Sequence, residues 1–112
     1  MQLNIKQRFA LRSIFKPQAT SLFEADLLDE FYDKIKITSE EAEKLNMRSG
    51  DGETTWDIDK DKGLGVDISG ALLKLFQTTV KEADEQKKIP YDPDDKSIYE
   101  LAKHILNGDK DK

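Results

Sequence analysis

Cysteine is absent from this chain of 112 residues, and histidine and tryptophan each occur once. Without cysteine there is no disulfide framework, no cysteine-ligated zinc or iron–sulfur cluster and no thiol nucleophile. With one histidine, the sequence shows no recognisable metal cluster and no series of nucleophile, base and orienting residue. A glycine-rich phosphate-binding loop is also missing. We therefore expect a protein that is not an enzyme and that needs no cofactor.

Long apolar runs are lacking as well. No run approaches the roughly 18 apolar residues that a membrane span requires, and the N-terminus lacks the apolar block of a secretion signal. Charge is abundant instead: 37% of the residues are charged, 23 acidic and 18 basic, for a formal net charge of −5. An acidic total disfavours nucleic acids and anionic membranes, which reward clustered Lys and Arg through counterion release. We expect a cytoplasmic protein that does not associate with membranes.

Helix start signals are clear in this sequence. The capping-box spacing, a Ser, Thr or Asn followed three residues later by Glu or Gln, occurs at Asn4 and Gln7, at Ser21 and Glu24, and at Thr38 and Glu41. Together with apolar residues at three- and four-residue steps, these signals predict helices over 5–15, 22–36 and about 39–47. Two further helices are predicted, one capped by Ser69 and ending near Gln86, the other starting at Pro93 and ending at Asn107.

The only strand-like alternation lies around the tryptophan. Trp56 and Ile58 alternate with aspartates, and so do Val66 and Ile68, which is typical of two half-buried strands. Pairing them leaves a three-residue loop, 61–63, with Gly63 in the left-handed position that such a loop favours. We therefore predict a β-hairpin near 54–68.

These elements predict an α+β fold: a mainly helical single domain over residues 1–108, with five helices and one β-hairpin packed on them. Residues 109–112 are expected to form a frayed tail. The turn-forming segment from Ser49 to Glu53 is expected to form a flexible tip.

Alternating aspartates raise a second interpretation of the same stretch. Asp57, Asp59 and Asp61 match the first, third and fifth positions of a calcium-binding EF-hand loop, and Asp67 could add a further ligand. The match fails where Lys62 replaces the turn-forming glycine and where the final glutamate is missing. We prefer a hairpin with a solvated acidic face, and a calcium-stabilised domain remains the alternative.

Candidate partner-binding residues are Arg8, Arg12 and Trp56. Residues 1–23 contain basic but no acidic side chains, and acidic residues follow at once in 24–33. The preferred interpretation is that two helices face each other with complementary charge. The alternative is that the first helix, through Arg8 and Arg12, binds an acidic partner. Trp56 is interpreted first as a core residue between hairpin and helices, and second as an exposed anchor for a partner.

Four stretches carry a resemblance to a known group of proteins: "IKQRFALRSIF", "KITSEEAEKL", the single Trp in "TTWDI", and the closing "IPYDPDDKSIYELAKHIL". Their order along the chain resembles that of small uncharacterised proteins of tailed phages and prophages. The resemblance implies no activity and transfers no site residue. It implies an accessory or host-interacting viral protein, which would act in the host cytoplasm.

The sequence therefore predicts a non-catalytic protein-binding module whose partner is another protein. Neither the identity of that partner nor the oligomeric state follows from the sequence. A third hypothesis, besides the calcium-stabilised domain, is an acidic mimic of nucleic acid, which requires carboxylates clustered on one face.

Overall fold

The computed structural model describes residues 1–108, so the predicted frayed tail at 109–112 lies outside the described residues. Its main elements are the five α-helices that the sequence predicts. They are α1 (Ile5–Arg12), α2 (Leu22–Ile35), α3 (Ser39–Lys44), α4 (Gly70–Glu85) and α5 (Ser97–Asn107).

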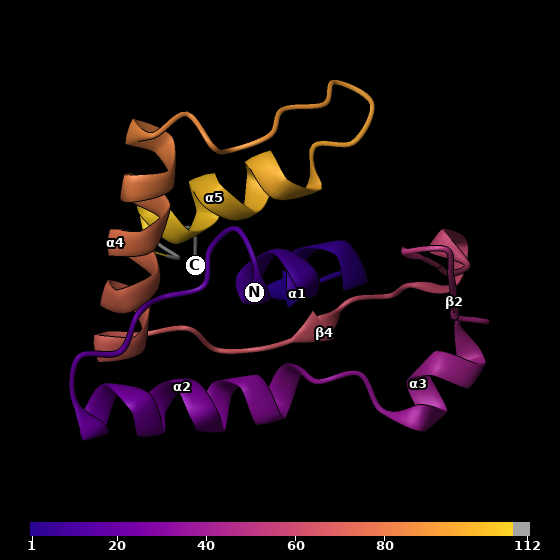
Figure 1. Ribbon diagram of the computed structural model, residues 1–112, viewed down its shortest axis with the longest axis horizontal. Coiled ribbons are helices and arrows are strands. Elements are labelled where there is room, and N and C mark those ends of the chain that lie inside the picture. Colours follow the sequence, from indigo (N-terminus) through magenta and orange to yellow (C-terminus); the bar gives the residue numbers. More distant parts are fainter. Residues whose placement is uncertain (109–112) are drawn as a thin grey trace.

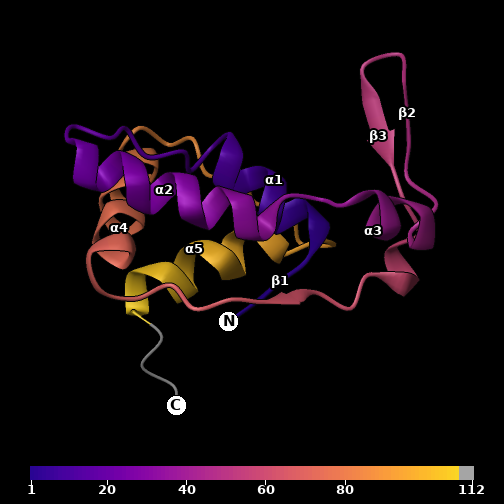
Figure 2. The ribbon, with the colours of Figure 1, turned by 90° about the horizontal axis from the view of Figure 1, so that it is seen from below.

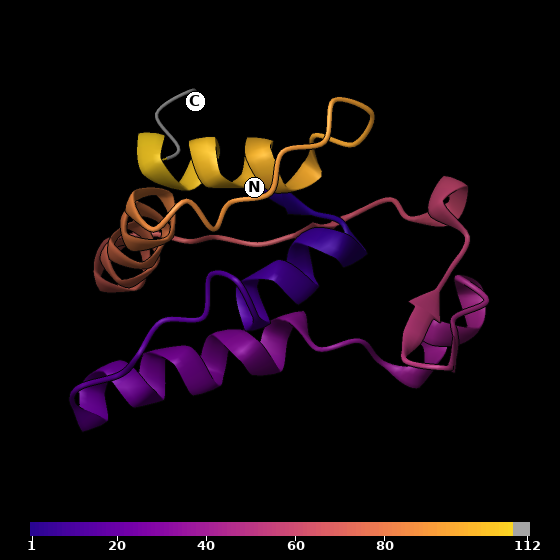
Figure 3. The same cartoon turned by 45° about the horizontal axis from the view of Figure 1, so that its top comes forward.

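Helix α1 lies between α5 on one side and α2 on the other, and α4 crosses the group at one end (Figure 1, Figure 3). Helix α3 and the chain that follows it extend from the opposite end (Figure 1). The α4 end and the α3 end are therefore the two extremities of the molecule.

One apolar core joins the four longer helices. Phe31 of α2 and Phe76 of α4 meet edge to face at its centre, with ring centroids 5.3 Å apart. The other buried members of this cluster come from the N-terminal strand, the four helices and the segments between them: Leu3, Ala10, Leu11, Phe15, Leu28, Ile35, Ile68, Val80, Ala83, Ile98, Leu101, Ala102 and Ile105. Helical periodicity therefore identified the faces that pack together.

Two capping boxes form as the sequence predicts. The side chains of Asn4 and Thr38 accept hydrogen bonds from the N–H groups of Gln7 and Glu41, whose side chains accept in return from the capping residues' N–H groups. Ser21 caps α2, but the carboxylate of Glu24 turns to Thr20 instead. The predicted starts of α1, α2 and α3 are thereby confirmed.

The last helix starts later than predicted. Asp92 Oδ1 accepts from Asp94 N–H at 2.9 Å, which forms a local turn where the sequence predicted the first helical residues. Asp95 then accepts from Ser97 N–H at 3.1 Å, and α5 begins there. Aspartates favour such turns as readily as helix caps, so the boundary moved by one turn.

The predicted hairpin at 54–68 is wrong. Residues 64–65 form β4 (Leu64–Gly65), which pairs antiparallel with the N-terminal β1 (Gln2–Leu3), and Ile58–Lys60 forms a 3-10 turn. Two bonds between Met1 and Val66 extend the β1–β4 pairing, one at 2.9 Å and one at 3.2 Å. The second segment of the alternating pattern does contain a strand, β4, but that strand pairs with β1, which is distant in the sequence.

A hairpin does exist, but it starts six residues before the predicted one. Strand β2 (Arg48–Gly50) pairs with β3 (Glu53–Thr55), joined by a tight turn at Asp51 and Gly52, both with positive φ. All its side chains are exposed, and it projects away from the helices (Figure 2). The predicted flexible tip at 49–53 is thus the end of this hairpin, which does not pack on the helices.

The predicted fold class is confirmed: the chain is α+β and mainly helical, with short two-stranded pairings. Among the helices of residues 1–108, none combines the length and apolarity that crossing a bilayer demands.

Candidate functional site

Arg8 is not an exposed residue of the first helix, contrary to the partner-binding prediction. Its side chain is only 3% exposed and points into the junction of α1, α2 and α3. The guanidinium donates to the carbonyl of Ile35 at 2.8 Å and to that of Lys36 at 2.9 Å. It also donates to both carboxylate oxygens of Glu41, at 2.7 and 3.0 Å. The Arg8 guanidinium therefore donates its hydrogen bonds to groups of the same chain.

The environment of Glu41 follows from this contact. The hydrogen bonds from Arg8 hold the pKa of the Glu41 carboxyl below its ordinary value of 4.5, against an opposing effect of partial burial. A charge-assisted bidentate pair of this kind fixes both direction and distance. Arg8 and Glu41 therefore position α1 and α3 relative to each other.

Arg12, the second predicted partner-binding residue, is exposed on α1. Its guanidinium lies 5.7 Å from the ring centroid of Tyr32 and donates to the Tyr32 carbonyl at 3.3 Å. The Tyr32 hydroxyl in turn donates to the Leu11 carbonyl at 2.6 Å, and burial raises the pKa of Tyr32 to about 12. Arg12 is thus placed by an aromatic ring but keeps its charge toward solvent.

Trp56 is not a core residue, so the preferred interpretation of the sequence is wrong here. It is half-buried and lies outside the cluster of core residues. Its ring contacts the ring of Phe9 edge to face, with centroids 5.9 Å apart and planes at 70°. Phe9 is itself 36% exposed. The two rings therefore form a contact at the surface, between α1 and the chain that follows β3.

Phe9 connects the two remaining predicted residues. It meets Trp56 on one side, and with Arg8 and Arg12 it lines a hollow of about 210 Å³ whose other walls come from the end of α2 and the residues after it. Ile58, which is 76% exposed, follows two residues after Trp56. We call Phe9, Arg12, Trp56 and Ile58 the aromatic platform. The structure thus brings Arg12 and Trp56 to Phe9 at the surface, whereas Arg8 lies buried at the bottom of the neighbouring hollow.

The projecting hairpin rises beside the aromatic platform, because Trp56 follows directly on β3. Across the hairpin, the hydroxyls of Ser49 and Thr54 are 3.1 Å apart. Its type of turn, with φ of 52° at Asp51 and 79° at Gly52, matches the twist of a two-residue hairpin. A partner that covers the platform therefore also meets the base of this hairpin.

The four aspartates proposed as calcium ligands each make separate contacts in the described residues and do not form one cluster. Asp57 accepts from the Asn46 amide at 2.6 Å and pairs with Lys60 at 3.4 Å. These contacts, that of Asn46 first, lower the pKa of Asp57. Asp61 accepts from the N–H of Ile5 at 2.8 Å. Within residues 1–108, no group of three or more metal-ligating side chains of the kinds present could hold an ion.

The fourth aspartate is also engaged locally. Asp67 accepts from the Ser69 hydroxyl at 3.3 Å. The aspartates are spread along a 3-10 turn and an extended segment, where alternate side chains do not converge on a centre. Their structural roles, above all that of Asp61 at the start of α1, explain this stretch without a metal.

Phe9 is the functional candidate that the sequence did not reveal, because it appeared to belong to the apolar stripe of α1. The buried residues of that helix are instead Ile5, Arg8, Ala10 and Leu11. A signal was available: a stripe drawn through Ile5, Leu11 and Phe15 leaves Phe9 outside.

No family model, curated protein or solved structure matches the chain in comparisons with known proteins.

Proposed function

We propose that this protein is a non-catalytic protein-binding module and that its partner binds the aromatic platform. The observation that carries the proposal is the Phe9–Trp56 contact, which leaves both rings partly exposed outside the core. Trp and Arg are the residue types that most often dominate binding energy at protein interfaces, and Arg12 lies on the same surface. A large aromatic pair gains most when a partner removes it from water.

The chemistry of the platform describes the kind of segment that fits it. Two aromatic rings and Ile58 favour an apolar side chain of the partner, and the exposed Arg12 favours a carboxylate beside it. Rim charges of this kind add mainly to orientation and rate of association, and the aromatic contact supplies the affinity.

Affinity capture with matched variants tests the proposal. Trp56→Ala and Arg12→Glu both change the platform, and Lys88→Glu changes an exposed charge at the distant end of α4. We expect one protein to be retained by the wild type and by Lys88→Glu, and to be lost or strongly reduced with Trp56→Ala. Equal capture by all variants, or capture by none, contradicts the proposal.

The folded state of Trp56→Ala must be established in the same experiment. Because Trp56 is half-buried, we expect this variant to keep the circular dichroism spectrum and a cooperative melt. Phe76→Ala, which removes a ring with 0% exposure, is the comparison for true loss of core packing and costs about 3–5 kcal/mol. A Trp56→Ala variant as unstable as Phe76→Ala would mean that the ring is structural.

No specific observation favours the nucleic-acid mimic, because Glu41, Asp57, Asp61 and Asp95 are engaged by cations, amides or N–H groups of the same chain. The phage-like layout and the cytoplasmic location stay predictions. They are consistent with a small accessory protein that acts by binding another protein.

A further inference from the structure

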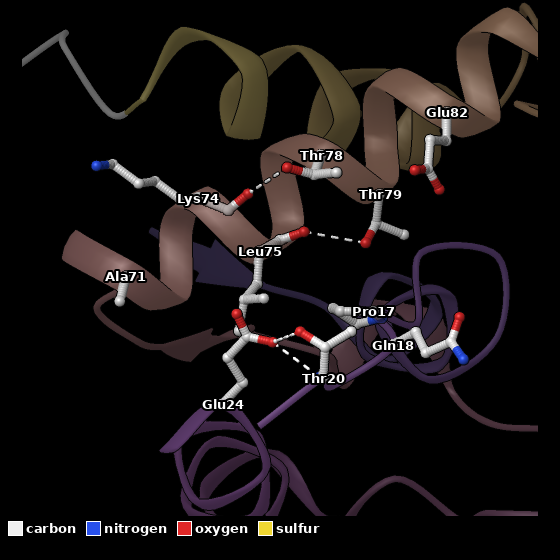
Figure 4. A pocket seen from close by; sticks show the side chains of 10 residues that line it. All are labelled: Pro17, Gln18, Thr20, Glu24, Ala71, Lys74, Leu75, Thr78, Thr79 and Glu82. Atoms are coloured by element: carbon white, nitrogen blue, oxygen red, sulfur yellow. Dashed lines mark hydrogen bonds between the residues drawn. The ribbon is translucent and has the colours of Figure 1, made fainter. Parts of the chain in front are cut away.

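A groove of about 460 Å³ lies at the α4 end of the molecule, between α4 and the segment that leads into α2 (Figure 4). The α2 side contributes Pro17, Gln18, Thr20 and Glu24. Helix α4 contributes one stripe over three turns, in which Leu75 and Thr79 are half-buried and the others exposed: Ala71, Lys74, Leu75, Thr78, Thr79 and Glu82.

The threonines of this groove direct their hydroxyls to their own helix. Thr78 Oγ1 donates to the Lys74 carbonyl and Thr79 Oγ1 to the Leu75 carbonyl, each at 3.0 Å. Such bonds leave the γ-methyl groups to form the surface of the stripe. Beside Ala71 and Leu75, the centre of the α4 stripe is therefore apolar.

Polar groups on the opposite wall of the groove are also hydrogen-bonded within the chain. Glu24 accepts from both the N–H and the hydroxyl of Thr20, at 2.9 and 2.8 Å, and these contacts lower the pKa of the Glu24 carboxyl. The helix that begins there also exposes two large apolar side chains, Leu22 at 86% and Phe23 at 64%. This end of the molecule thus has apolar surface that nothing in residues 1–108 covers.

Two charges flank the apolar centre symmetrically. Lys74 precedes Thr78 by four residues and Glu82 follows it by four, so the charges lie on one helix face about 12 Å apart along the axis. Neither takes part in an ion pair among the described residues. A stripe with opposite charges at equal distances from its midpoint is complementary to itself when turned by 180°.

We propose that two copies of this chain associate through the α4 grooves, with a two-fold axis passing close to Thr78. The two α4 helices then run antiparallel, and Lys74 of each copy lies opposite Glu82 of the other. A two-fold interface uses the same patch on both subunits, which is the arrangement that this charge pattern requires. The small side chains of Ala71 and Thr78 allow the helices to approach closely.

The test is a set of charge reversals measured by sedimentation equilibrium over a micromolar to low-millimolar range of protein concentration. Lys74→Glu and Glu82→Lys each place like charges opposite one another twice, and we expect each to raise the dimer dissociation constant about tenfold or more. The double variant Lys74→Glu/Glu82→Lys restores both pairs with reversed sign, so its dissociation constant returns toward that of the wild type.

Lys88→Glu is the matched control for Lys74→Glu, since it changes the net charge by the same amount and sign without lying on the stripe. Melting curves establish that every variant is folded, as expected for exposed positions. A wild type that stays monomeric over the whole range contradicts the proposal. So does a double variant that remains as weak as the single reversals, or a loss of association with Lys88→Glu.

Discussion

At the scale of single residues, Arg8 is the one charged side chain within residues 1–108 that is buried. Its guanidinium is almost fully buried and satisfied by two carbonyls and one carboxylate. Removing the guanidinium leaves two carbonyls and the partly exposed Glu41 carboxylate without their donor, which is more costly than breaking a pair between two exposed side chains. The stability of the α1–α3 junction therefore depends on this contact.

Arg8→Ala is expected to lower the free energy of unfolding by about 1–3 kcal/mol, because two carbonyls and the Glu41 carboxylate lose their donor. Arg12→Ala, on the same helix but exposed, is the control and is expected to cost less than about 1 kcal/mol. Urea unfolding followed by circular dichroism measures both. Equal losses for the two variants would show that Arg8 is not the structural residue inferred from its contacts.

Acid sensitivity is a second consequence at this scale. Contacts with Lys6 and then Ser97 lower the pKa of Asp95 from 3.8 to about 2, and Lys6 Nζ lies 2.6 Å from its carboxylate. A depressed pKa stabilises the fold above the unfolded-state pKa, and that contribution is lost as the pH falls toward the folded-state value. Glu41 acts in the same direction.

We therefore expect the melting temperature to fall between about pH 4 and pH 2, and Asp95→Asn to flatten part of this fall. Asp84→Asn, at an exposed position of α4 outside these contacts, is the control. The measurement is a series of thermal melts across this pH range. If the melting temperature of Asp95→Asn falls with pH as steeply as that of the wild type, the ion pair between Lys6 and Asp95 does not contribute to the acid sensitivity.

At the scale of elements, the hairpin β2–β3 stands apart from the rest of the fold. It is two-stranded, all its side chains are exposed, and an isolated pair of this length is marginal in water. Helices α4 and α5, in contrast, contribute buried side chains to the common core. The two regions should therefore open with very different free energies.

Native-state hydrogen exchange is expected to show the difference directly. Amides of β2 and β3 should exchange by local opening, whereas core amides of α4 and α5 exchange only near the global unfolding free energy. Gly52→Ala, which places a side chain at φ of 79°, should speed exchange in the hairpin without changing that of α5. Hairpin amides as protected as those of α5 would contradict this view.

The elements also show where sequence reasoning succeeds and where it fails. Helix starts are encoded within four residues, as in the boxes at Asn4 and Thr38, so local spacing predicts them. The pairing of β4 with β1 joins residues more than sixty positions apart, and alternation near Trp56 carries no information about that partner. Gly63 has the predicted positive φ, but in a different context.

The candidate site, like the secondary structure, could be predicted from the sequence only in part. Arg12 and Trp56 were singled out by residue type, and the structure places both on one surface through Phe9. Burial of Arg8 depends on carbonyls at the end of α2 and on Glu41, which only the folded chain brings together. Residue type alone therefore names candidates but does not separate structural from exposed arginines.

At the scale of the whole molecule, two partly apolar surfaces lie on different parts of one helical core. The aromatic platform joins α1 to the chain that follows β3, and the α4 groove lies at the end of the molecule that α4 forms (Figure 1). Because they are separate, one copy could bind its partner while associating with a second copy. We propose partner binding for the first surface and self-association for the second.

The most direct test of partner binding is acrylamide quenching of tryptophan fluorescence, since Trp56 is the only tryptophan in the chain. In the free protein we predict that the half-buried ring is quenched readily, and that adding the captured partner protects it. A ring that resists quenching in the free protein, or one that remains equally accessible in the complex, would contradict the assignment of the aromatic platform as the binding surface.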